Sequence, residues 1–69
     1  MDIQKSFGNK IRELRLKQEL SQEELAFKSN IHRTYIGCIE RGEKNISLKN
    51  IYKISKALNI KLKEIFENL

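Results

Sequence analysis

The apolar residues of this 69-residue chain recur at intervals of three and four along nearly its whole length. This spacing is the period of an α-helix and not that of a β-strand. Glycine, asparagine and serine divide the pattern into short segments, and proline is absent. We therefore expect an all-α fold of five short helices. A chain of this length has room for one modest core, so residues 1–69 are predicted to form a single domain.

Two helices are expected before the middle of the chain. The first is predicted because its apolar residues share one face of a helix, and it is expected to end near Glu19. These residues are Phe7, Ile11 and Leu14. Ser21 followed by Glu24 is a capping box, which predicts the start of a second helix. This helix is expected to end near Ser29, since Asn30 tolerates the left-handed conformation of a sharp turn.

A third helix is predicted from Arg33 to Arg41, with Ile36 and Ile39 buried on its inner face. The few residues before it would form a tight turn between two helices. Gly42 follows the third helix and supplies a left-handed stop. The outward face of this helix is expected to carry Arg33, Thr34, Gly37, Cys38 and Arg41.

Two more helices are expected in the last third of the chain. Ser47 is predicted to cap a fourth helix that ends at Asn59. Its inward residues are expected to be Leu48, Ile51, Ile54, Ser55 and Leu58. A last helix within residues 61–69 is predicted by the helical spacing of Leu62, Ile65, Phe66 and Leu69. Lys61 stands where a serine or threonine cap is usual, so the start of this helix is the least defined.

The charge of the chain favours a polyanionic partner. Lysine and arginine number 14 against 9 acidic residues, which gives a formal net charge of +5 on a small body. Such a positive potential attracts nucleic acid, which is therefore the leading candidate for a partner.

Cysteine and histidine are too few for a disulfide framework or a metal site. Cys38 is the only cysteine and His32 the only histidine, and neither a metal nor a cofactor is expected. The N-terminus lacks the pattern of a secretory signal, and no apolar run is long enough to cross a bilayer. We expect a cytoplasmic protein without a membrane partner, and a free thiol fits that compartment.

The stretch from Ser21 to Gly42 resembles the helix-turn-helix of the Cro and C1 repressor family, also called the XRE family. The resemblance covers residues 7–69. Its motifs are SQEELA at 21–26, YI at 35–36, IERG at 39–42 and ALNI at 57–60. Within the family, the chain is most similar to the controller proteins of restriction-modification systems, through HRTYI at 32–36, ERG at 40–42 and NISL at 45–48.

This resemblance implies a five-helix, lambda-repressor-like DNA-binding domain whose helix-turn-helix consists of the second and third helices. In such a motif the third helix enters the major groove and presents its first side chains to base edges. Arg33 and Thr34 stand at that end, and Cys38 matches a family position that often reaches bases. Candidates for contacts with the DNA backbone are Gln22, His32, Tyr35, Arg41, Lys44 and Asn45.

The family pattern implies two further features. It pairs Glu40 with a basic residue at the position of Arg15, and this structural ion pair would lock the third helix onto the first. Small members of the family dimerise through the last helix, which here would offer Leu62, Ile65, Phe66 and Leu69. A two-fold dimer would place its two recognition helices about one DNA turn apart, roughly 34 Å.

We therefore expect a sequence-specific transcription regulator that binds a pseudo-palindromic operator as a homodimer, as the controller of a restriction-modification system. The alternatives are a phage-type repressor, the antitoxin of a toxin-antitoxin pair, and a protein-interaction module without affinity for DNA. The sequence contains no catalytic constellation and leaves no room for an effector pocket. Neither enzymatic activity nor a small-molecule ligand is expected.

Overall fold

The computed structural model describes residues 2–69, which form five α-helices and, within that range, no strand. The helices are α1 (Ile3–Lys17), α2 (Gln22–Ser29), α3 (Arg33–Glu40), α4 (Leu48–Leu58) and α5 (Leu62–Phe66). The predicted all-α class is confirmed. α1 ends slightly earlier than expected, because Glu19 adopts a left-handed conformation with φ of 57°.

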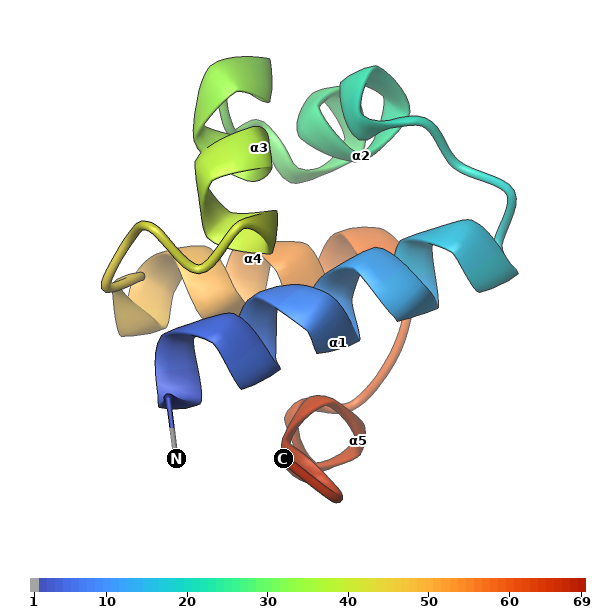
Figure 1. Cartoon of the computed structure of the whole chain (residues 1–69). Helices are drawn as coiled ribbons and strands as arrows, with labels where there is room; N and C mark the ends of the chain where they lie inside the picture. The colour runs from blue at the N-terminus through green and yellow to red at the C-terminus, as the bar shows by residue number, and fades with distance from the viewer. Residues whose placement is uncertain (1) are drawn as a thin grey trace.

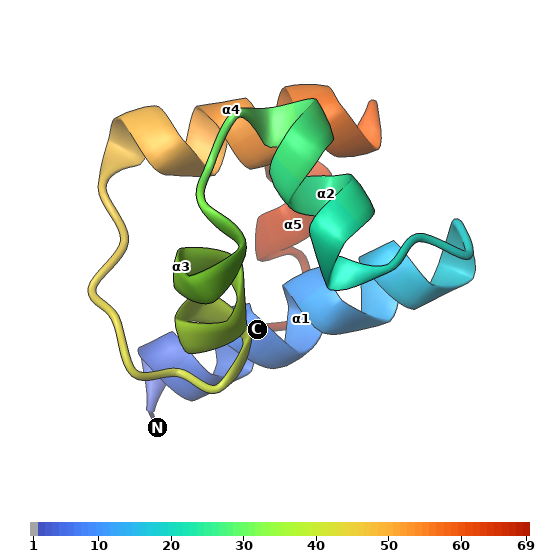
Figure 2. The same cartoon turned by 90° about the horizontal axis from the view of Figure 1, so that it is seen from above.

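The two longest helices, α1 and α4, form opposite sides of the molecule (Figures 1 and 2). At one end of the molecule α2 and α3 contact each other. There α3 packs against α1, and α2 packs against α4. α5 contacts both α1 and α4 at the other end. The helix-turn-helix pair and the C-terminal helix therefore lie at opposite ends of the molecule (Figure 1).

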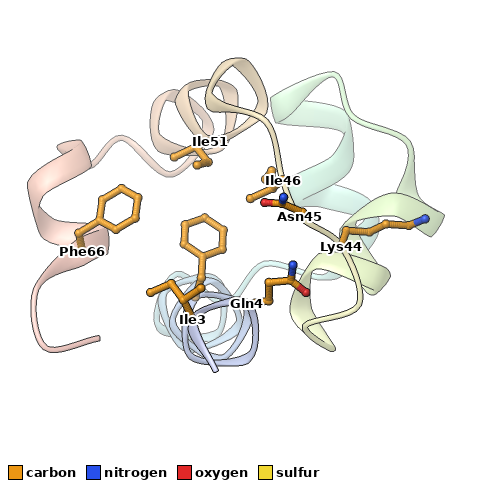
Figure 3. A pocket seen from close by; sticks show the side chains of 8 residues that line it. Ile3, Gln4, Lys44, Asn45, Ile46, Ile51 and Phe66 are labelled. Carbon is orange, nitrogen blue, oxygen red and sulfur yellow. The ribbon is translucent and has the colours of Figure 1, made fainter. Parts of the chain in front are cut away.

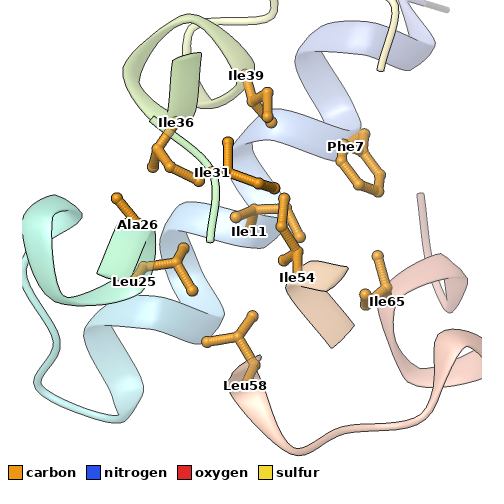
Figure 4. Packing of buried hydrophobic residues seen from close by; sticks show 10 residues of the cluster. All are labelled: Phe7, Ile11, Leu25, Ala26, Ile31, Ile36, Ile39, Ile54, Leu58 and Ile65. Carbon is orange, nitrogen blue, oxygen red and sulfur yellow. The ribbon is translucent and has the colours of Figure 1, made fainter. Parts of the chain in front are cut away.

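All five helices and the turn before α3 contribute to one apolar core, whose side chains converge between the helices (Figure 4). Its members are Phe7, Ile11, Leu25, Ala26, Ile31, Ile36, Ile39, Ile54, Leu58 and Ile65. Removing this apolar surface from water supplies most of the driving force for folding. Because α2 and α3 both contribute to the core, their relative orientation is fixed by packing and not by the turn alone.

The expected helix caps are present. Ser21 Oγ accepts a hydrogen bond from the backbone N–H of Glu24 at 3.0 Å, and the Glu24 carboxylate accepts one from the N–H of Ser21 at 2.8 Å. Asn30 and Asn59 end their helices in the left-handed conformation, with φ of 57° and 55°. These caps satisfy backbone groups that have no partner inside the helix.

The first turn of α4 departs from the prediction. Leu48 was expected to point inward, but its side chain is 76% exposed. α4 packs against α2 and α5, and its first turn extends past the end of α2, where no helix covers it (Figure 2). Burial begins with the half-buried Ile51 and is complete at Ile54, Ser55 and Leu58.

The residues of the last helix that were expected at a dimer interface lie partly in the core and partly on the surface. Ile65 is fully buried inside the single chain, so its assignment to a dimer interface is corrected: it has no surface left to offer a partner. Leu62 and Phe66 remain 36% and 46% exposed, whereas Leu69 is half-buried against the core. The Phe66 ring packs on Phe7 with the ring centroids 5.8 Å apart.

Candidate nucleic-acid interface

The turn between α2 and α3 sets the exposed start of α3. Asn30 reverses the chain, and Ile31 anchors the turn in the core. The backbone N–H of Thr34 donates a hydrogen bond to Nδ1 of His32, at 3.1 Å. His32 therefore caps α3, and the side chains that follow it extend into solvent.

Arg33 and Thr34 are both exposed in this first turn of α3. Arg33 Nε lies 3.5 Å from a carboxylate oxygen of Glu23 on α2, and both side chains are more than half exposed. An ion pair in such a position contributes little to stability and exchanges partners easily. The Arg33 guanidinium is thus available to an acceptor outside the protein.

The middle of α3 differs from the expectation for Gly37. This residue was expected on the open outward face, but it is buried because two side chains cover it. A Cβ placed on Gly37 would lie 3.1 Å from Nη1 of Arg41 and 3.7 Å from Oε1 of Gln22. The neighbouring thiol of Cys38 is half-buried and accepts a hydrogen bond from Nη2 of Arg41 at 3.5 Å.

Arg41, which was expected to contact the DNA backbone, forms an ion pair with Glu43. Its Nε and Nη2 donate to the two carboxylate oxygens at 3.1 and 3.2 Å. The hydrogen bonds with Arg41 lower the pKa of Glu43 and raise that of the arginine. No role was predicted for Glu43, and the one sequence feature that points to this ion pair is the acidic residue two positions after the arginine.

Beneath the surface, Arg15 and Glu40 form the structural ion pair that the sequence assigned to them. Arg15 Nε and Nη2 donate to the two oxygens of Glu40 at 2.7 and 2.9 Å, and Nη1 donates to the carbonyl of Leu20 at 2.8 Å. The hydrogen bond to Glu40 raises the pKa of Arg15. Both side chains are less than 10% exposed, with values of 8% and 3%.

Gln22 joins this network, because its Nε2 donates to Oε1 of Glu40 at 3.1 Å. Its side chain was expected to contact a phosphate, and in the free protein it connects the start of α2 to the end of α3. The amide is half-buried beside Gly37. Gln22 thus positions the two helices that carry the candidate DNA contacts.

Two glycines allow α1 to approach the end of α3 closely. A Cβ on Gly8 would meet the carbonyl oxygens of Ile39 and Glu40, the second at 2.7 Å. Gly42 has φ of 75°, and a Cβ there would lie 2.8 Å from Cα of Lys5. Gly8 was not among the residues predicted to matter, although a glycine inside an amphipathic helix is itself a signal of close approach.

The remaining candidates lie beside or beyond α3. Tyr35 is half-buried against the core, and Lys44 and Asn45 are exposed in the segment between α3 and α4. These last two residues border a mostly apolar pocket that Ile3 and Phe66 also line, at the meeting point of the two ends of the chain (Figure 3). Neither Arg33 nor Thr34 lines this pocket.

Residues 2–69 do not offer two other kinds of site. They contain no cluster of three or more histidine, cysteine or acidic residues placed to hold a metal ion. In the same range no helix has both the length and the apolar composition that crossing a membrane requires.

Comparison with known proteins decides the family. The family model described as helix-turn-helix matches residues 11–65. The control protein C.BamHI of Bacillus amyloliquefaciens is 52% identical over 67 residues, which cover 96% of this chain and 83% of that protein. The chain belongs to the helix-turn-helix family, in the group of restriction-modification control proteins.

Solved structures of this family agree with the fold. The controller protein C.AhdI from Aeromonas hydrophila superposes with a TM-score of 0.93 at 47% identity, covering 96% of this chain and all of that one. The controller protein C.Esp1396I, solved as a tetramer with its natural 35 base-pair operator, matches with a TM-score of 0.85 at 38% identity, covering 91% and 83%. The control-protein resemblance predicted from HRTYI and NISL is confirmed.

Proposed function

We propose that this protein is the controller of a restriction-modification system, a transcription regulator that binds operator DNA and has no catalytic activity of its own. The observation that carries the proposal is the exposed first turn of α3. Arg33 and Thr34 project from it on a helix that the core and the Glu40 network hold rigidly. Controller proteins similar along nearly the whole chain support it, one of them solved on its operator.

In the proposed complex, α3 lies in the major groove with its N-terminal end toward the base edges. Arg33 donates two hydrogen bonds to a guanine, and Thr34 contacts a neighbouring base through its hydroxyl or methyl group. Lys44 and Asn45, beyond the other end of the helix, contact phosphates, which fixes the register without reading sequence. The net charge of +5 adds an attraction that weakens with salt.

A homodimer completes the proposed regulator. Leu62 and Phe66 on α5 are large apolar side chains left exposed by the single chain, and they lie at the end of the molecule opposite α2 and α3. Contact through this end leaves both recognition helices free. A two-fold axis at the α5 end places the two α3 helices symmetrically, which fits a pseudo-palindromic operator.

The test is selection of bound duplexes from a random library at two salt concentrations, followed by sequencing. A two-fold symmetric motif, with an affinity that falls steeply as salt rises, supports the proposal. Recovery of no motif, with an equally steep salt dependence, would indicate non-specific binding. A flat salt dependence without a motif would indicate a protein-interaction module, and either result overturns the proposed function.

A further inference from the structure

Arg33, Gly37 and Arg41 form one row along α3, in which Gly37 is buried beneath the side chains of Arg41 and Gln22. They stand four residues apart, and residues at this spacing are neighbours on the surface of a helix. Arg41 is the C-cap residue and keeps a right-handed helical conformation, with φ of −83° and ψ of −3°. The row thus continues without a break from the first turn of α3 to its end.

The Arg41 side chain folds back toward the start of the helix, as long side chains on helices do. Its Nη2 donates to Sγ of Cys38 at 3.5 Å, and its Nη1 lies 3.1 Å from the point where a Cβ of Gly37 would stand. The guanidinium therefore lies over Gly37. A helix interior disfavours glycine, and here its missing side chain gives the guanidinium room, because a Cβ would lie a few tenths of an ångström too close to Nη1.

Glu43 fixes the orientation of this guanidinium. Its two carboxylate oxygens accept from Nε and Nη2 at 3.1 and 3.2 Å, so the carboxylate and guanidinium form the paired geometry that restricts rotation. Nη1 makes no hydrogen bond within residues 2–69 and stays available to an acceptor. Arg41 thus presents a planar donor over the middle of α3, where Gly37 and Cys38 offer no large polar group.

We propose that Arg41 reads a base through the space above Gly37, with Glu43 as its positioning residue. This inference rests on the proposed function. The ligand is a guanine in the major groove, whose O6 and N7 accept hydrogen bonds from an arginine. The sequence predicted that Arg41 contacts a phosphate. Its guanidinium, however, lies over the middle of the row that begins with Arg33, so both arginines would face the same groove.

The test compares three proteins on the selected operator and on duplexes with each base pair changed in turn. The proteins are the wild type, Arg41→Lys and Lys44→Ala. Arg41→Lys keeps the charge but loses the planar pair of donors, so we expect it to lose discrimination at one base pair of each half-site by roughly 5- to 150-fold. Lys44→Ala is expected to weaken binding to all duplexes by one common factor.

Gly37→Ala provides a second variant, because its Cβ would shift the guanidinium by a few tenths of an ångström while Arg41 itself stays present. It should reduce discrimination at the same base pair by a smaller factor. If Arg41→Lys instead weakens all duplexes alike, the inference is overturned and the proposed function stands. A wild type that prefers no sequence overturns both.

Discussion

The Arg15 guanidinium on α1 and the Glu40 carboxylate at the end of α3 form two parallel hydrogen bonds, 2.7 and 2.9 Å long, inside the protein. Gln22 of α2 donates to the same carboxylate at 3.1 Å. One buried acidic group therefore connects α3 to both helices that flank it. This connection, together with the core, fixes the direction in which α3 presents its outer face.

Glu40→Leu or Arg15→Met alone should destabilise the fold by about 3 kcal/mol, because each leaves a buried charge without its partner. The double variant should recover most of this loss, since it removes both charges together. The free energies of unfolding in urea for the two single variants and the double variant provide the measurement. Losses that simply add in the double variant would show that the two charges are not coupled.

Gly8→Ala should destabilise the protein by about 1–3 kcal/mol, because the new Cβ meets backbone carbonyls of α3 that cannot move without separating the helices. Gly37→Ala is the matched control. Its Cβ meets side-chain atoms and no backbone, Nη1 of Arg41 at 3.1 Å and Oε1 of Gln22 at 3.7 Å, and alanine favours the helix by about 1 kcal/mol. Thermal unfolding of both variants should show a large loss for the first and little loss for the second; equal changes would contradict the close approach at Gly8.

The capping box at Ser21 should make stability depend on pH in the acid range. The hydrogen bond from the Ser21 backbone lowers the pKa of Glu24 from its usual value of 4.5. The folded protein therefore holds that proton less tightly than the unfolded chain does, and the resulting stabilisation is present above about pH 4.5 and is lost as the pH falls through the folded-state pKa.

Glu24→Gln keeps the shape of the cap but removes this titration. Melting temperatures between pH 7 and pH 3 should therefore decline less in Glu24→Gln than in the wild type. Parallel declines in the two proteins would show that the cap does not contribute to the acid sensitivity.

Leu62→Glu should convert the proposed dimer to a monomer of 8.2 kDa, because a charge on α5 would be buried against the partner. Phe27→Glu is the control: Phe27 is 89% exposed, and its helix α2 lies at the end of the molecule opposite α5 (Figure 1). Sedimentation equilibrium should find this control still dimeric. A dimer that survives both Leu62→Glu and Phe66→Glu would place the interface elsewhere.

The sequence predicted the elements that depend on side-chain periodicity and on local capping. The helices, the Ser21 and Glu24 cap and the left-handed Asn30 and Asn59 follow from interactions within a few residues, which a single sequence displays directly. The prediction for Leu48 was wrong because periodicity identifies the apolar face of a helix, but not how far along the helix a neighbour covers it.

The candidate site was less accessible to sequence reasoning, because its geometry depends on contacts between helices. Gln22 and Gly37 were each assigned an outward role, and both are involved in packing between α2 and the end of α3. Gly8 was not predicted to matter, because its role is to leave space where another residue would have a side chain. Ile65 was placed at an interface, since an apolar stripe does not by itself distinguish the core from a partner.

DNA binding by Arg33→Ala shows whether the exposed start of α3 reads the base sequence. Its affinities for the selected operator and for a random duplex should be compared with those of the wild type and of Arg12→Ala, an exposed arginine on α1. We predict a loss of about 1–3 kcal/mol on the operator, a much smaller loss on random DNA, and little difference between the two duplexes for the control. Equal losses on the operator and on random DNA for Arg33→Ala would show that the start of α3 does not read the sequence.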